Sequence, residues 1–257
     1  MPDRVASGAE IWAEQGGSSG PALMLLHGLG ANADVWQKMK ALVEKEWPGR
    51  WIVPDLRGHG RSGHRAPYGY AGHAADMAAL LGQHEEAVVV GHSMGGVVAM
   101  AMASGWYGVK VRHVIAFGVK IRWTPDEVTK LHALGQAPVR WFATRDEAVD
   151  RYLKVSGLFG LVDPASAAAR SGIREEGGRF RLASDPAING AAGPDVAAFV
   201  AAARAPIRLA AGSKDAMVTL ADMQPFDPAP EIFEGAGHNL HVERPDELWR
   251  FVRRAIA

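Results

Sequence analysis

Short, wholly apolar segments recur along the chain, and each is followed by a group of turn-forming residues. Such runs are typical of strands that are buried on both faces of a parallel sheet. Longer segments with apolar residues at helical spacing separate them. We predict strands at 10–15, 22–26, 51–53, 87–90, 111–117, 207–211 and 231–233, and helices at 32–45, 70–81, 97–103 and 245–256. This alternation predicts a doubly wound, mostly parallel sheet of the α/β class.

The alternation stops after residue 122 and resumes near residue 205. Between these positions the pattern predicts helices and loops but no core strand, with helices at 125–134, 145–155, 164–171 and 194–203. Since the strand pattern then returns, we interpret residues 123–204 as a helical insertion into the sheet domain.

One stretch combines a strand, a tight turn and a helix. Residues 88–96 read Val-Val-Val-Gly-His-Ser-Met-Gly-Gly, and Gly91-His92-Ser93-Met94-Gly95 fits the G-x-S-x-G pattern of a nucleophilic serine. Side chains at the two glycines would collide with the neighbouring backbone in so tight a turn. We therefore interpret Ser93 as a nucleophile; the alternative is a strand–helix turn without a catalytic role.

Composition narrows the classes of function. The 257 residues can form one large domain or a core with an insertion. Lys+Arg and Asp+Glu both number 28, so the zero net charge gives no support to a nucleic acid or anionic membrane partner. The absence of cysteine excludes disulfides and thiol catalysis, and no metal-ligand spacing occurs, so we expect neither metal nor cofactor. No apolar run suits a signal peptide or a membrane span, so we expect a cytoplasmic protein.

Five motifs in chain order carry a resemblance to a known family. The chain resembles the α/β-hydrolase superfamily, specifically its capped serine esterase-like members, through His27-Gly28-Leu29-Gly30, residues 55–62 (Asp-Leu-Arg-Gly-His-Gly-Arg-Ser), residues 91–96, Gly212-Ser213-Lys214-Asp215 and Gly235-Ala236-Gly237-His238. The resemblance implies an α/β-hydrolase core of residues 1–122 and 205–257. It also implies a helical cap of residues 123–204. These residues match the family's cap only in their position along the chain and in their helical character.

A nucleophilic serine requires two further side chains in the active site. The hydroxyl needs an adjacent base, and the base needs a carboxylate on its second nitrogen. The family's chain order of serine, acid and histidine implies Ser93, Asp215 and His238. Asp222 and Asp227 remain alternative carboxylates. His241 is interpreted as a surface or helix-start residue.

The negative charge that forms on the substrate oxygen needs oriented N–H donors. The resemblance implies the backbone N–H groups of Leu29 and Met94. His27 is predicted to brace the loop that contains Leu29, and His92 is interpreted as structural. The charged glycine-rich loop 55–62 is predicted to hold a turn.

The expected activity follows from a serine at position 93. Haloalkane dehalogenases and epoxide hydrolases of this superfamily use an aspartate there, so acyl transfer to water remains. We predict a serine carboxylesterase that hydrolyses small to medium acyl esters through an acyl-enzyme. Alternatives are a carbon–carbon bond hydrolase of ring-fission diketones, a ligand-sensing protein with little turnover, and a cofactor-free perhydrolase. The sequence leaves acyl length, alcohol preference and oligomeric state open.

Overall fold

A seven-stranded sheet forms the centre of the computed structural model, which describes residues 5–6, 9–18, 20–82, 85–191, 193 and 195–257. The strand order is β11-β10-β7-β6-β4-β5-β3. The strands are Ala13–Gly16 (β3), Ala22–Leu26 (β4), Trp51–Pro54 (β5), Glu86–His92 (β6), Lys110–Phe117 (β7), Ile207–Gly212 (β10) and Glu231–Phe233 (β11). Neighbouring strands are parallel except β3 and β5. The predicted doubly wound, mostly parallel sheet is confirmed.

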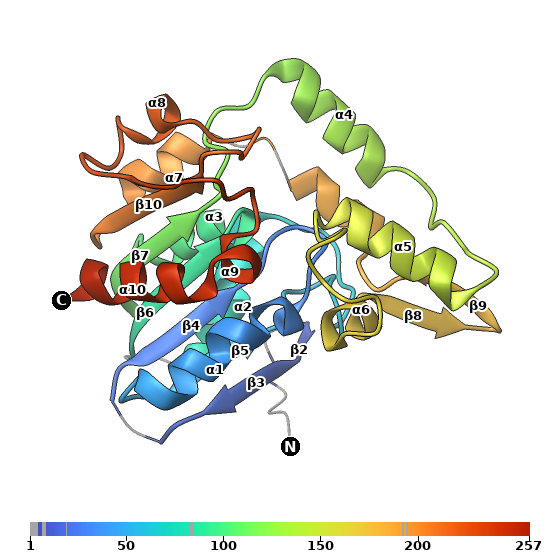
Figure 1. Cartoon of the computed structure of the whole chain (residues 1–257), viewed down its shortest axis with the longest axis horizontal. Coiled ribbons are helices and arrows are strands. Elements are labelled where there is room, and N and C mark those ends of the chain that lie inside the picture. Colours follow the sequence, from blue (N-terminus) through green and yellow to red (C-terminus); the bar gives the residue numbers. More distant parts are fainter. Residues whose placement is uncertain (1–4, 7–8, 19, 83–84, 192, 194) are drawn as a thin grey trace.

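The continuous apolar runs are explained by burial on both faces of the sheet. In β4, Leu23 and Leu25 pack into the core on one face, whereas Met24 and Leu26 pack into the core on the other. Alternate side chains of a strand point to opposite faces, so a doubly covered strand has no polar position. Helices Gln37–Glu46 (α1) and Pro245–Ile256 (α10) cover the first face, and Tyr70–Leu81 (α2), Met94–Met102 (α3) and Val196–Ala202 (α7) cover the second (Figure 1).

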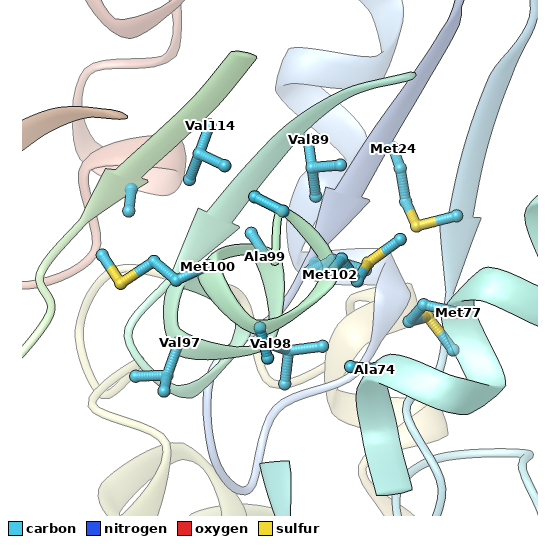
Figure 2. Close-up of a cluster of buried hydrophobic side chains, with 14 of the residues drawn as sticks. Met24, Ala74, Met77, Val89, Val97, Val98, Ala99, Met100, Met102 and Val114 are labelled. Carbon is cyan, nitrogen blue, oxygen red and sulfur yellow. The ribbon is translucent and has the colours of Figure 1, made fainter. Parts of the chain in front are cut away.

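Helix α3 is the most enclosed of these elements. All nine of its residues are buried, because it packs against strands β6 and β7 as well as helices α2 and α7. Figure 2 shows Met100 and Met102 on opposite sides of α3, with Met77 of α2 near Met102. A helix that is apolar all round belongs in such an interior position. The sheet and this helix together fix the turn between them.

Several predicted boundaries differ from the structure. The first predicted strand is divided into β2 (Glu10–Ile11) and β3, and β2 pairs with β1 (Val5–Ala6) in a separate two-stranded sheet. The predicted helix 32–45 begins as a 3-10 turn, Ala33–Trp36, before α1. The short helices Leu220–Met223 (α8) and Leu240–Glu243 (α9) were not predicted.

The insertion leaves the sheet after β7 and returns at β10, which is the neighbouring strand. It contains Pro125–Gly135 (α4), Arg145–Val155 (α5), Ala167–Ser171 (α6), the 3-10 helix Pro186–Ala191 and α7. The prediction of helices and loops missed one element, because Ile173–Glu176 (β8) and Arg179–Leu182 (β9) form an antiparallel hairpin that is separate from the central sheet. Gly177 and Gly178 make the turn with φ values of 58° and 74°, which side chains disfavour.

Helix α6 begins three residues later than predicted, and the predicted start of α7, Pro194, lies outside the described residues, as do residues 1–4 and 7–8 of the N-terminal stretch. Helix α7 packs on α3 against the core. In the described part of the chain, every helix is too short or too polar to cross a membrane.

Candidate active site

Ser93 lies at a strained turn between β6 and α3. Its φ of 51° makes it the one non-glycine residue with positive φ in the described part of the chain. Such a conformation costs about 1–3 kcal/mol and persists only where the surroundings impose it. Its N–H donates to the carbonyl of Phe117 at 2.9 Å, and its own carbonyl accepts from Gly96 N–H at 2.9 Å. The turn is therefore held from both sides.

The two glycines of the turn are required by close backbone contacts. A Cβ on Gly91 would lie 2.4 Å from the carbonyl oxygen of Gly95. A Cβ on Gly95 would lie 2.4 Å from the carbonyl oxygen of Leu26 in β4. Because these are backbone atoms in a packed sheet, no rotamer change could relieve the clash. The predicted steric role of both glycines agrees with these distances.

Asp215 and His238 meet across two loops that follow the last two strands. The loop after β10 carries Asp215, and the loop after β11 carries His238. His238 Nδ1 donates to Asp215 Oδ2 at 2.8 Å, with the carboxylate side chain 1% exposed and the imidazole 24% exposed. The second carboxylate oxygen of Asp215 accepts the N–H of Met217 at 2.9 Å. The acid is thus fixed, and the ring keeps one nitrogen for other chemistry.

Gly212 permits the approach of these two loops. A Cβ at this position would lie 2.2 Å from the carbonyl oxygens of Ala236 and Gly237. Glu243 of α9 holds the second loop on either side of the histidine. Its carboxylate accepts the N–H of Gly237 at 2.7 Å and that of Asn239 at 3.0 Å. The sequence analysis missed Glu243, since nothing in its local pattern separates it from a surface glutamate.

The loop after β4 is braced by two buried histidines. His27 Nδ1 donates to the carbonyl of Gly28 at 2.8 Å, and its Nε2 accepts the N–H of Leu56 at 2.9 Å. This agrees with the predicted bracing role. His59 Nε2 accepts the N–H of Gly30 at 3.1 Å. Burial lowers the pKa of His27 to about 4 and that of His59 to about 3, so both rings are neutral at pH 7.

The charged loop after β5 does more than hold its own turn. Asp55 is fully buried and accepts the N–H of Ala33 at 2.6 Å and that of Arg61 at 2.8 Å. Arg61 Nε also donates to the same carboxylate at 2.7 Å. Together with His59, this loop therefore fixes both ends of the segment between Gly30 and Ala33.

His92 and His241 pack behind His238. His92 is buried, and its Nε2 donates to the carbonyl of His238 at 3.1 Å, which agrees with its interpretation as structural. The prediction that His241 is a surface residue was wrong. It lies in α9, as the helix-start alternative required, but is fully buried between Trp36 and His92 with ring centroids 4.6 and 4.7 Å away.

The alternative carboxylates have other roles. Asp222 accepts the hydroxyl of Thr219 at 2.7 Å at the start of α8. Asp227 is 1% exposed and accepts the N–H of Leu209 at 2.7 Å, besides pairing with Arg208. Neither carboxylate lines the cavity that contains Asp215.

A cavity of about 600 Å³ brings the predicted site residues together; its lining includes Leu29, Ser93, Met94, Asp215 and His238. The N–H of Met94 belongs to the first turn of α3, where a helix has no acceptor of its own, and the helix dipole favours an anion there. The opposite wall comes from the insertion, with Trp123, Leu131, Val155 and Ile188. The cavity thus places a hydroxyl, an acid-linked imidazole and a helix N-terminus beside an apolar wall.

Comparisons with known proteins bear on the fold and on the family of the chain. A pimeloyl-[acyl-carrier protein] methyl ester esterase of Vibrio vulnificus is 31% identical over 170 residues, which are 63% of this chain and 60% of that protein. An uncharacterized Mycobacterium tuberculosis protein is 43% identical over 88 residues, but these span 33% of this chain and only 25% of that protein. The solved structure of E-2-(acetamidomethylene)succinate hydrolase has a TM-score of 0.81 at 21% identity, covering 100% of this chain and 98% of that one.

The family model described as the alpha/beta hydrolase family matches residues 23–251, which include the sheet from β4 onward, the insertion and the first half of α10. The chain therefore belongs to the alpha/beta hydrolase family.

Proposed function

We propose that this protein is a serine carboxylesterase that hydrolyses small to medium acyl esters. The observation that carries the proposal is the 2.8 Å bond from His238 to the buried Asp215 in the same cavity as Ser93. An imidazole fixed by a carboxylate is the base that a serine hydroxyl needs. The ester hydrolases among the relatives support the reaction class.

In the proposed reaction, Ser93 Oγ attacks the ester carbonyl and His238 Nε2 takes the hydroxyl proton. Asp215 stabilises the imidazolium through Nδ1–H, and the N–H groups of Leu29 and Met94 stabilise the oxyanion. His238 then protonates the departing alcohol, which leaves an acyl-enzyme. A water molecule attacks this ester with His238 as base, and the acid product is released.

The test compares 4-nitrophenyl esters of two to eight acyl carbons with wild type and Ser93→Ala. We expect the variant to lose at least ~10³-fold in kcat, as triad deletions do. Ser156 provides a matched control, because it lines the same cavity while its hydroxyl donates to the carbonyl of Tyr152 at 2.7 Å. Ser156→Ala should retain kcat within about threefold.

Two results would count against the proposal. A Ser93→Ala rate within tenfold of wild type would mean that the nucleophile is misassigned. Faster wild-type turnover of a dienoate ring-fission diketone than of every ester would favour carbon–carbon bond hydrolysis by the same residues.

A further inference from the structure

A second cavity, of about 590 Å³, adjoins the one that contains Ser93. The two cavities share four lining residues, Leu29, Leu131, Val155 and Ile188. The second cavity, called the distal chamber below, is formed by α4, α5, the end of β9 and the 3-10 helix of the insertion. Figure 1 shows α4 and α5 on the same side of the molecule. The shared residues make the distal chamber a continuation of the candidate active site.

The wall of the distal chamber exposes large apolar side chains. Leu134, Val139 and Val155 line it and are 53%, 39% and 42% exposed. None of the residues of α4 is buried. A soluble monomer rarely leaves a contiguous apolar surface open unless a ligand or partner covers it. The chamber therefore suits the apolar part of a ligand.

The charge of the distal chamber is positive. Arg140 and Arg151 line it, and its lining includes no aspartate or glutamate. Both arginines are exposed. Within the described residues the Arg151 guanidinium has neither an ion pair nor a hydrogen bond. Arg140 lies over the ring of Phe142, 5.0 Å from its centroid. The guanidinium of Arg151 is thus available to a ligand.

The first cavity differs, because three of its four lining lysines are already paired with acids. The pairs are Lys120–Glu127, Lys130–Asp126 and Lys154–Asp150, at 2.5 to 2.7 Å. The fourth, Lys214, has no ion pair among the described residues and lies next to Asp215. Uncompensated positive charge is therefore found at Lys214 and, on the far side of the shared residues, at Arg151.

We propose that the distal chamber binds the remote part of the substrate, an apolar chain that ends in a carboxylate held by Arg151 and Arg140. The proposal rests on the proposed function and adds a substrate class, esters with a distal anionic end. A guanidinium matches a carboxylate through two parallel N–H donors. The apolar side chains that line the chamber, among them Leu134 and Val139, accommodate the methylene chain.

The test compares substrates of equal length that differ only in the terminal charge. On the acyl side these are 4-nitrophenyl hydrogen suberate and 4-nitrophenyl octanoate, with shorter and longer homologues. On the alcohol side they are 7-carboxyheptyl butyrate and octyl butyrate. We expect wild type to prefer the carboxylate-ended member of at least one pair by about fivefold or more in kcat/KM, corresponding to about 1 kcal/mol.

The variant Arg151→Glu should reverse this preference, because kcat/KM should fall further for the carboxylate-ended ester than for the neutral ester. Arg145→Glu is the matched control, since Arg145 is exposed on the same helix and lines neither cavity. A preference in neither pair would overturn the proposal. So would a preference that Lys214→Gln abolishes and Arg151→Glu retains, because the anion would then bind in the first cavity.

Binding to Ser93→Ala separates this proposal from the proposed function. Calorimetry should detect tighter binding of monomethyl suberate than of methyl octanoate, and Arg151→Glu in the same background should remove the difference. Esterase activity without a preference for the carboxylate-ended esters would overturn the proposal for the distal chamber and leave the proposed function intact. Arg151-dependent binding of monomethyl suberate in a protein that hydrolyses no ester would support the chamber and refute the esterase.

Discussion

Acid should destabilise this protein well before its carboxylates titrate, because five histidines are buried in neutral form. Burial lowers the pKa of His27 to about 4 and of His59, His73 and His241 to about 3, and it lowers the pKa of His92 as well. In the unfolded chain each ring titrates near pH 6.5. Between pH 6.5 and 4 the unfolded state therefore binds more protons, and stability is lost as the pH falls.

The magnitude follows from this difference in proton uptake. At pH 5.5 each such histidine lowers the free energy of unfolding by about 1.4 kcal/mol relative to pH 8. The four rings with a defined pKa together remove about 6 kcal/mol, which is a large part of the 5–15 kcal/mol of a typical domain. Above pH 7 the contribution is constant, because the rings are then neutral in both states.

Urea unfolding followed by tryptophan fluorescence between pH 5 and 8 measures the effect. At constant ionic strength, the slope of the unfolding free energy against pH near pH 5.5 should correspond to three or more protons taken up on unfolding. His73 offers a single-site test, since both ring nitrogens are buried without a hydrogen-bond partner in the described part of the chain. Burial is the main cause of its lowered pKa, and the positive charge of Arg57 further opposes protonation of the ring.

His73→Leu should reduce this slope by about one proton. Met77→Leu is the control on the same helix, and it should leave the slope unchanged because it alters packing without removing a titrating group. A wild-type slope below one proton would refute the reasoning, because the folded protein would then protonate these rings as readily as the unfolded chain.

Three further predictions test other parts of the structure. Asp215→Asn should lower kcat on 4-nitrophenyl butyrate by about 10³–10⁴-fold with a similar urea midpoint, and a change below tenfold would reject this acid. Asp227→Ala should lower the unfolding free energy by about 3 kcal/mol, because Leu209 N–H loses its buried acceptor, while kcat at 20 °C stays within twofold. Gly95→Ala should fail to accumulate as folded protein by circular dichroism, whereas Gly69→Ala, where nothing lies within 4 Å, should fold normally.

The sheet was predictable because its strands carry their own signal. Residues 22–26 are apolar at every position, and burial on both faces of a parallel sheet leaves no place for a polar one. Ser93 was predictable for a related reason, since the tight turn from β6 into α3 leaves no room for side chains at 91 and 95. Both signals lie within short stretches of the chain, so they can be recognised from the sequence without the structure.

The hairpin of β8 and β9 was missed although one signal for it exists. Its residues read Ile-Arg-Glu-Glu and Arg-Phe-Arg-Leu, so charged side chains hide the strand pattern. The Gly177-Gly178 pair between them is a dipeptide typical of hairpin turns, and it indicates the hairpin from the sequence. The buried residues of the two strands are Ile173 and Arg181, and an arginine at a buried position removes the alternation that one covered face would otherwise produce.

The supporting contacts around the candidate site could not be predicted. Glu243 is near in sequence to the loop that it holds, which carries His238. No residue pattern, however, distinguishes Glu243 from a glutamate on a surface helix. The bond from His59 to Gly30 joins residues 29 positions apart. Such contacts depend on where whole loops meet at the edge of the sheet, which only the packed structure determines.

The neutral state of the bracing histidines links stability to the site. His27 and His59 each donate from one ring nitrogen to a carbonyl and accept an N–H with the other. An imidazolium has two donors and no acceptor, so protonation would set Nε2–H against the N–H of Leu56 or Gly30. The second of these belongs to the loop that carries the proposed oxyanion donor at Leu29. Burial lowers the pKa of these rings to about 4 and about 3 in the folded protein, so above pH 4 acid should release this loop only in molecules that unfold.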